Sequence, residues 1–376
     1  MSALTGTTGT TGTTGTTGTT GTTGTTGTIP AVVNGYPGYA GTLANTVLGC
    51  GLDLSRDAIK SSLKELTVGA YGPGRPLLPA TLDEPASLAR WQPEIRHKVL
   101  GWEVTGDLSF AAGETSGRPH FELRWRGQPL VRIVRPSLDE FRKQAQSTIE
   151  DREKLVGNNS VKMRLNEVLS QITPAFSFWS AIIPLHPDRT PKTLELVQLA
   201  LELGSNVVLR IKHALACPRP YELNSHCHPA ILTPSHGSLP SGHATESSTV
   251  STLLAHLLSA TPGHESADYG HALRMLAQRV AANRVAAGVH YRIDSIAGQI
   301  LGETLGAHMV ALCTGDMNVQ PCAFDGQGDI DETVMEVAGP AHEQIGLYQA
   351  MGKALAPPAN PQLQWLWKAA RAEWGY

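Results

Sequence analysis

The runs KHALACPRP at residues 212–220, PSGH at residues 240–243 and RVAAGVHYRID at residues 284–294 decide how this chain is interpreted. The first run supplies fixed cations, and the second supplies a hydroxyl and the free N–H groups of a helix start. The third supplies a histidine with a carboxylate nearby. Each run alone has an ordinary structural explanation, but together they outline a pocket for a tetrahedral oxyanion.

In the first run, Lys212 and Arg219 are seven residues apart. This spacing is about two helical turns, so an unbroken helix would carry both side chains on one face. Pro218 and Pro220 prevent an unbroken helix, and we expect it to end near Ala216. Arg219 then lies on a stiff turn that fixes the direction of its guanidinium. The alternative is a solvated basic face.

In the second run, Ser241 is expected to be the N-cap of a helix, which leaves the first N–H groups pointing outward as an anion site. Gly242 lets the backbone approach a ligand closely, and His243 is placed to exchange protons with it. The alternative is an ordinary helix start with an exposed histidine.

In the third run, Arg284 lies late in a helix that Gly288 is expected to end, and His290 follows on the connecting turn. Asp294, four residues later, can accept a hydrogen bond from one ring nitrogen of His290 and leave the other more basic. An Arg, a His and an orienting Asp form a nucleophile arrangement. A structural histidine is the alternative.

The combined pattern K-x6-R-P, P-S-G-H, R-x5-H-x3-D resembles the superfamily of type 2 phosphatidic acid phosphatases (PAP2), bacterial nonspecific acid phosphatases and vanadium-dependent haloperoxidases. Asn283 departs from it, since a Ser commonly precedes the arginine. The resemblance implies that His243 is the acid–base and that His290 attacks phosphorus in a phosphatase or ligates vanadium in a haloperoxidase. It also implies that the oxyanion oxygens are held by Lys212, Arg219, Arg284, Ser241 and the N–H of Gly242.

Two local features favour the haloperoxidase branch. Arg292 stands two residues after the expected ligand His290, and His236 stands five residues before Ser241, where related bromoperoxidases carry a histidine. His236 can also be an ordinary loop histidine. Leu209 stands where haloperoxidases often have an aromatic or polar residue that lines the halide pocket, so the sequence does not decide which halide is used. The segment His226–Cys227–His228 is interpreted as a loop because no fourth ligand stands at a zinc-like spacing.

We therefore expect a vanadium-dependent haloperoxidase that uses hydrogen peroxide to oxidise bromide or iodide, rather than chloride, and passes the halogen to a small organic acceptor. Vanadate is the expected cofactor, and phosphate could occupy the same site. The alternative is an acid phosphatase that hydrolyses phosphomonoesters through a phosphohistidine. A third possibility is a noncatalytic oxyanion-binding protein.

The expected fold is all-α, a helical bundle of the PAP2/haloperoxidase type at residues 136–376, preceded by a largely irregular region at residues 29–135. That region contains one β-hairpin over residues 120–134, around Gly127. Residues 1–28 are expected to be a disordered tail, because residues 5–28 are an almost pure Thr-Gly-Thr repeat. The expected helices are 137–156, 161–183, 190–216, 241–259, 264–287, 292–313, 341–354 and 361–374.

Composition limits the partners. Thirty Lys and Arg against 33 Asp and Glu give a net charge of −3, which argues against nucleic-acid binding. The five cysteines lack CxxC spacing, and no apolar run reaches the roughly 18 residues of a membrane span. No secretory signal is visible, so a cytoplasmic location is the default, with export left open. A homodimer is compatible with large helical surfaces.

Overall fold

The structure is a computed structural model that describes residues 54–55, 82–156, 160–172, 176–259, 269–327 and 347–375. Asp83–Tyr376 form one compact unit, which includes segments on both sides of the expected boundary at residue 135. The Thr-Gly repeat lies outside the described residues, so its disorder stays a prediction. The helices of this unit are η3 (Pro85–Arg90), α3 (Pro93–Thr105), α4 (Leu138–Val156), α5 (Ser160–Ser170), α6 (Phe176–Ser180), α7 (Pro191–Leu215), α8 (Pro220–Leu223), α9 (Gly242–Leu258), α10 (Tyr269–Ala286), α11 (Arg292–Thr314) and α12 (Pro361–Ala372).

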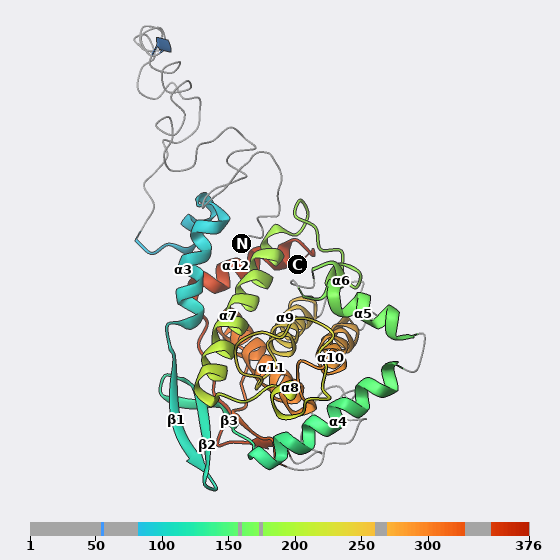
Figure 1. The fold of residues 1–376 in the computed structure, drawn as a ribbon. Coiled ribbons are helices and arrows are strands. Elements are labelled where there is room, and N and C mark those ends of the chain that lie inside the picture. Colours follow the sequence, from blue (N-terminus) through green and yellow to red (C-terminus); the bar gives the residue numbers. More distant parts are fainter. Residues whose placement is uncertain are drawn as a thin grey trace, which may run out of the picture. The chain divides into compact units, whose positions relative to one another are not determined.

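Helices α9 and α11 are the centre of the unit and pack against each other over most of their length (Figure 1). Their close approach depends on glycines one turn apart on α11. A Cβ atom at Gly298 would lie 2.6 Å from the carbonyl oxygen of Ser241, and one at Gly302 would lie 2.4 Å from that of Thr245. Helices α7 and α10 also pack on α9. The starts of α9 and α11 are thereby held together with the end of α10.

A five-stranded sheet in the order β1-β2-β3-β4-β5 corrects the all-α expectation. The predicted hairpin is confirmed, because β2 and β3 are antiparallel and joined by Arg126 and Gly127, both with positive φ. The strand β4 lies parallel to β3, and β5 pairs with β4. The strands are β1 (Leu108–Thr115), β2 (Arg118–Trp125), β3 (Gln128–Val134), β4 (Cys322–Asp325) and β5 (Tyr348–Ala350).

Most helices expected after residue 136 are confirmed within a few residues of their predicted ends. The helix expected at 161–183 is instead two, α5 and α6, and Pro174 falls between them in the sequence. The helix expected at 341–354 is wrong where the structure describes it, because residues 348–350 pair with β4. The described part of the region expected to be irregular, residues 85–134, contains η3, α3 and three strands.

One described helix, α11, is long and apolar enough by composition to cross a membrane. Its apolar window is 89% buried inside the structure. The same residues that give α11 its hydropathy form the centre of the helical core.

Candidate functional site

Lys212 is held at the C-terminal end of α7. The helix ends at Leu215, as the prolines predict, and Ala216 adopts the left-handed conformation that closes it. The Lys212 ammonium is buried and donates hydrogen bonds to the carbonyl oxygens of Gly237 (2.9 Å) and Ser238 (2.7 Å). Its third proton is left for a ligand. Burial and the charge of Arg219 lower the pKa of Lys212 to about 7.

Arg219 joins the first run to the third. Its Nη1 atom donates to the carbonyl oxygen of Val289 (2.6 Å) and lies 3.2 Å from Nε2 of His290. On its other side, Nε donates to the carbonyl oxygen of His236 (3.1 Å), and Nη2 lies 3.1 Å from Nδ1 of the same residue. His236 is therefore a direct neighbour of Arg219, although its side chain is exposed.

Ser241 is the N-cap of α9, as predicted, but its side chain does not cap the helix. The Ser241 hydroxyl is fully buried and has no hydrogen-bond partner. The backbone around it is fixed, because the Ser241 N–H donates to the carbonyl oxygen of Asp294 at 2.8 Å. A buried hydroxyl without a partner costs free energy unless a ligand satisfies it. Ser241 therefore has the position and the free capacity that an oxyanion contact requires.

His290 and Asp294 form a buried pair. The Nδ1 atom of His290 lies 2.9 Å from Oδ2 of Asp294, which also accepts the N–H of Tyr291 at 3.0 Å. Because the carboxylate accepts the Nδ1–H, Nε2 keeps its lone pair and faces Arg219. Burial, followed by the charges of Lys212 and Arg219, holds the pKa of His290 well below its usual value. The imidazole is neutral and can act as a nucleophile or a ligand.

Arg284 lies near the end of α10 with 1% of its surface exposed. Its Nη2 atom donates to the carbonyl oxygen of Val168 (2.9 Å) and to Oε1 of Gln171 (3.2 Å). Its Nε and Nη1 atoms are buried and have no partner. Burial lowers the pKa of Arg284 to about 10, so the guanidinium stays charged at neutral pH.

Helix α5 and the residues just after it contact the end of α10, and the sequence did not predict these contacts. Gln171 is buried there, and it accepts hydrogen bonds from both Asn283 (2.9 Å) and Arg284. Asn283, the residue that departs from the family pattern, also accepts from Nε of Arg164 at 2.9 Å. No spacing in the sequence links α5 to α10, because these contacts depend on tertiary packing.

His243 is partly exposed on the first turn of α9, and its ring lies close to the carbonyl groups of Gln171 and Ile172. Burial and the charge of Arg284 lower the pKa of His243 to about 4. The imidazole is therefore neutral at pH 7 and able to accept a proton.

The charges that lower the pKa of His290 include those of Lys212, Arg219, His243 and Arg284. The three predicted runs thus meet around one imidazole, and we call this region the cradle. The cradle comprises Lys212, Arg219, His236, Ser241, Gly242, His243, Arg284, His290 and Asp294. Its partnerless donors, Ser241 Oγ and Arg284 Nε and Nη1, call for a ligand rich in acceptors.

Two other expectations concern residues outside the cradle. Leu209 is 43% exposed on α7. Cys227 is buried with its thiol 3.7 Å from the carbonyl oxygen of Gly288, while His226 and His228 are exposed. Within the described ranges no three His, Cys, Asp or Glu side chains are grouped to hold a metal ion. A single histidine ligand to vanadate would not form such a group.

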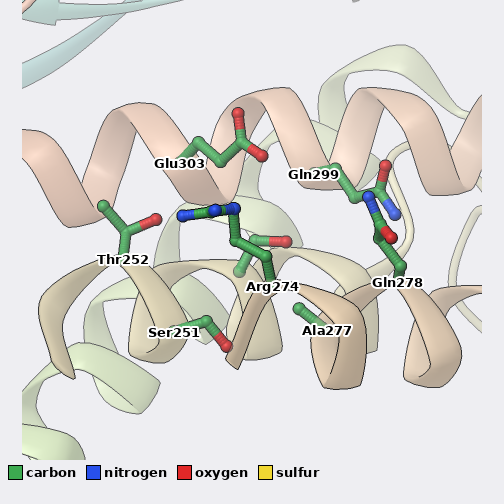
Figure 2. A pocket seen from close by; sticks show the side chains of 8 residues that line it. Ser251, Thr252, Arg274, Ala277, Gln278, Gln299 and Glu303 are labelled. Carbon is green, nitrogen blue, oxygen red and sulfur yellow. The ribbon is translucent and has the colours of Figure 1, made fainter. Parts of the chain in front are cut away.

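A polar pocket lies further along α9, α10 and α11 (Figure 2). The Arg274 guanidinium points toward Glu303 across it. One buried acceptor, Gln278 Oε1, and one buried donor, Gln299 Nε2, lack partners there. We call it the amide pocket, and its lining includes Ser248, Ser251, Thr252, Arg274, Gln278, Gln299 and Glu303.

The cradle is a buried, cation-lined group of side chains built around an oriented histidine. Residues 195–316, which carry all three runs, match the family model of the PAP2 superfamily. This part of the chain is therefore similar to members of that superfamily.

A solved structure described as the first bacterial vanadium-dependent iodoperoxidase is similar at 17% identity, with a TM-score of 0.37. The match covers 45% of this chain and 48% of that one, so the chain spans about half of the length of its structural neighbour. The comparison with curated proteins gives no match.

Proposed function

We propose that this protein is a vanadium-dependent haloperoxidase that uses hydrogen peroxide to oxidise bromide or iodide. The observation that carries the proposal is the set of buried donors without partners, on Ser241 and Arg284, beside a neutral His290. Such donors are already oriented before a ligand arrives, so they stabilise negative oxygens without a reorganisation cost.

The residues present fit vanadate. Lys212, Arg219 and Arg284 would neutralise its oxygens, and Nε2 of His290 would hold the vanadium. When bound, vanadate supplies a Lewis-acidic centre that activates hydrogen peroxide toward attack by a halide. Asp294 keeps the proton on Nδ1 of His290, so that Nε2 stays available. The Ser241 hydroxyl and the N–H of Gly242 would complete the contacts to the oxygens.

The protonation state of His243 supports the peroxide reaction. A group with its pKa lowered to about 4 is neutral in the free site, and its ring nitrogen can take a proton from incoming hydrogen peroxide. His236, in contact with Arg219, gives further support because a histidine at this position is a feature of the bromoperoxidase branch.

The second candidate is a phosphomonoesterase, and the His290–Asp294 pair favours it. A neutral Nε2 with an orienting carboxylate on Nδ1 is what attack on phosphorus requires. In that reaction His243 must donate a proton to the leaving alkoxide, so a bound phosphate dianion would have to raise its pKa. The two candidates share a site and differ in what reacts there.

The test is bromination of a phenol-type dye by purified protein with hydrogen peroxide, after bound oxyanions are removed and with or without orthovanadate. Hydrolysis of p-nitrophenyl phosphate runs in parallel. We expect vanadate-dependent bromination that is lost in His290→Ala and retained in the control His226→Ala, an exposed histidine outside the cradle. Phosphate release that vanadate suppresses, without bromination or iodination, would instead support the phosphatase.

The same assays separate an enzyme from a noncatalytic binder. In His243→Ala an enzyme loses turnover much more than oxyanion affinity. If the wild-type protein binds sulfate tightly but shows neither bromination nor phosphate release, both catalytic candidates are contradicted.

A further inference from the structure

The contacts between α7 and α9 give these two helices a fixed register. A Cβ atom on Gly204 would lie 3.6 Å from both Cα and Cγ of Glu246, and one on Gly242 would lie 4.0 Å from Cγ1 of Val208. Lys212, one turn after Val208, reaches the carbonyls of the loop before α9. One face of α7 therefore runs antiparallel to the start of α9, and Glu246 lies over Gly204, which has no side chain to exclude it.

Exposure along the start of α9 marks the side that opens to solvent. Gly242, His243 and Glu246 are partly exposed, whereas the neighbouring positions 241, 244, 245, 247 and 248 are buried. Glu246 follows Gly242 by four residues and His243 by three, and residues at these spacings are neighbours on a helix surface. Gly242 and His243 belong to the cradle, so Glu246 lines the same opening one turn further in.

The direction of the side chain strengthens this placement. Side chains on a helix lean toward its N-terminus, so the Glu246 carboxyl leans back toward the turn of Gly242 and His243. The carboxyl makes no hydrogen bond to any residue in the part of the chain that the structure describes. A carboxyl in this position is therefore available to a ligand, to water or to the neighbouring imidazole.

The charge state of Glu246 suits a proton acceptor for His243. Burial raises the pKa of Glu246 to about 7, while the positive charge of Lys212 on α7 opposes that shift. On its own helix the facing titratable group is His243, whose pKa is lowered to about 4. A proton on the His243 ring therefore passes to the Glu246 carboxylate in the favourable direction.

We propose that Glu246 is the residue that accepts protons from His243 on the inner side of the cradle. This inference rests on the proposed function, in which His243 takes a proton from hydrogen peroxide. Once the His243 ring nitrogen has taken that proton, its N–H bond breaks and a new O–H bond forms on the Glu246 carboxylate. The Glu246 carboxyl then gives the proton to a water molecule that enters by the shared opening, and hydronium leaves to solvent. Glu246 acts through His243 and is a positioning and proton-accepting residue.

The first experiment compares the pH dependence of kcat and KM in wild type, Glu246→Gln and the control Glu303→Gln. Gln keeps the size of the side chain and removes the carboxylate that can accept a proton. Glu303 is also a partly exposed glutamate in a helical hollow, but it lies in the amide pocket (Figure 2). In Glu246→Gln we expect kcat at pH 8 to fall about 10-fold, with KM within about 2-fold. The rise of kcat through pH 7 should flatten, whereas Glu303→Gln should match wild type.

The second experiment needs no turnover. Sulfate keeps a constant charge above pH 3, so titration calorimetry at pH 7.5 in two buffers of different ionisation enthalpy measures the protons taken up by the protein. We expect Glu246→Gln to take up roughly half a proton fewer than wild type, because bound sulfate raises the pKa of a nearby carboxyl.

The outcomes separate this inference from the proposed function. An unchanged kcat profile together with unchanged proton uptake in Glu246→Gln would overturn it, provided thermal unfolding shows the variant folded. If wild type has neither activity, the proposed function fails and proton uptake alone decides whether Glu246 faces the cradle. Loss of sulfate affinity without any change in proton uptake would point to a structural role and also overturn the proposal.

Discussion

The cradle and the amide pocket are two polar sites that share helices α9, α10 and α11, and they differ in charge balance. The amide pocket holds one cation, Arg274, and one carboxylate, Glu303. The cradle gathers three cations around His290, and the Asp294 carboxylate is hydrogen-bonded to the imidazole. Polarity alone therefore does not mark a ligand site in this fold.

The groups without partners differ in the same way. In the amide pocket one donor and one acceptor are unsatisfied, Gln299 Nε2 and Gln278 Oε1, and a water molecule could serve both. In the cradle the guanidinium of Arg284 leaves two nitrogens that can only donate. Water satisfies such a site poorly because the positive charge remains, whereas an oxyanion supplies both acceptors and charge.

The largest expected difference between the cradle and the amide pocket is in catalysis. His290→Ala should lower kcat at least ~10³-fold in whichever of the two reactions wild type performs, because the nucleophile or ligand is lost. Gln299→Ala in the amide pocket should change kcat by less than about 3-fold. Steady-state kinetics on both variants measures the contrast, and a His290→Ala protein with near wild-type kcat would refute the cradle as the reaction centre.

The second-largest expected difference between the cradle and the amide pocket is in their effect on oxyanion affinity. In Arg284→Met we expect the Kd for sulfate to rise about 10- to 100-fold, since a hydrogen bond to a charged group contributes about 1.5–3 kcal/mol. Arg274→Met should leave the Kd unchanged. Calorimetry gives both values. Equal weakening by the two substitutions would mean that sulfate responds to general positive charge rather than to the cradle.

The close packing of α9 on α11 can be tested through stability. Gly298→Ala places a methyl 2.6 Å from the carbonyl oxygen of Ser241, and we expect it to lower the free energy of unfolding by about 1–3 kcal/mol. Gly101→Ala is the matched control, because nothing lies within 4 Å of its Cβ position on α3, and alanine favours a helix by up to about 1 kcal/mol. Denaturant unfolding of both variants measures the difference.

The smallest expected effect is the pH dependence of sulfate binding. The pKa of Lys212 is lowered to about 7, so its positive charge is present below that pH and lost above it. We therefore expect sulfate affinity to fall about 10-fold between pH 6 and pH 8. Lys212→Met should bind more weakly at pH 6 and show a shallower decline. Affinity that rises with pH would contradict this assignment of charge.

Much of the cradle could be predicted from sequence because its parts are local. The prolines around Arg219 end α7, Ser241 begins α9, and the spacing of His290 and Asp294 lets one carboxylate accept from the ring. The role of Gln171 could not be predicted, since it depends on α5 packing against α10. Sequence also predicted that Ser241 is the N-cap of α9 and offers a hydroxyl to a ligand, and the structure has that hydroxyl buried without a partner.

The fold, too, could be predicted only where the sequence signal is local. The alternation at residues 120–134 and the turn at Gly127 predicted β2 and β3. The four residues of β4 have no detectable period, and their strand character comes from pairing with β3 far away in the chain. For the same reason the segment of β5 resembled a helix in sequence, although residues 348–350 are extended along β4.

The parallel pairing of Val131 with Cys322 has a consequence for synthesis of the chain. The strand β3 leaves the ribosome about 190 residues before its partner β4. At about 5–20 residues per second, that edge stays unpaired for on the order of ten seconds or more. An open edge strand is a template for pairing with other chains. The nascent protein is therefore most vulnerable to aggregation while its helices are being made, and a chaperone that covers β3 during this interval would raise the yield of folded protein.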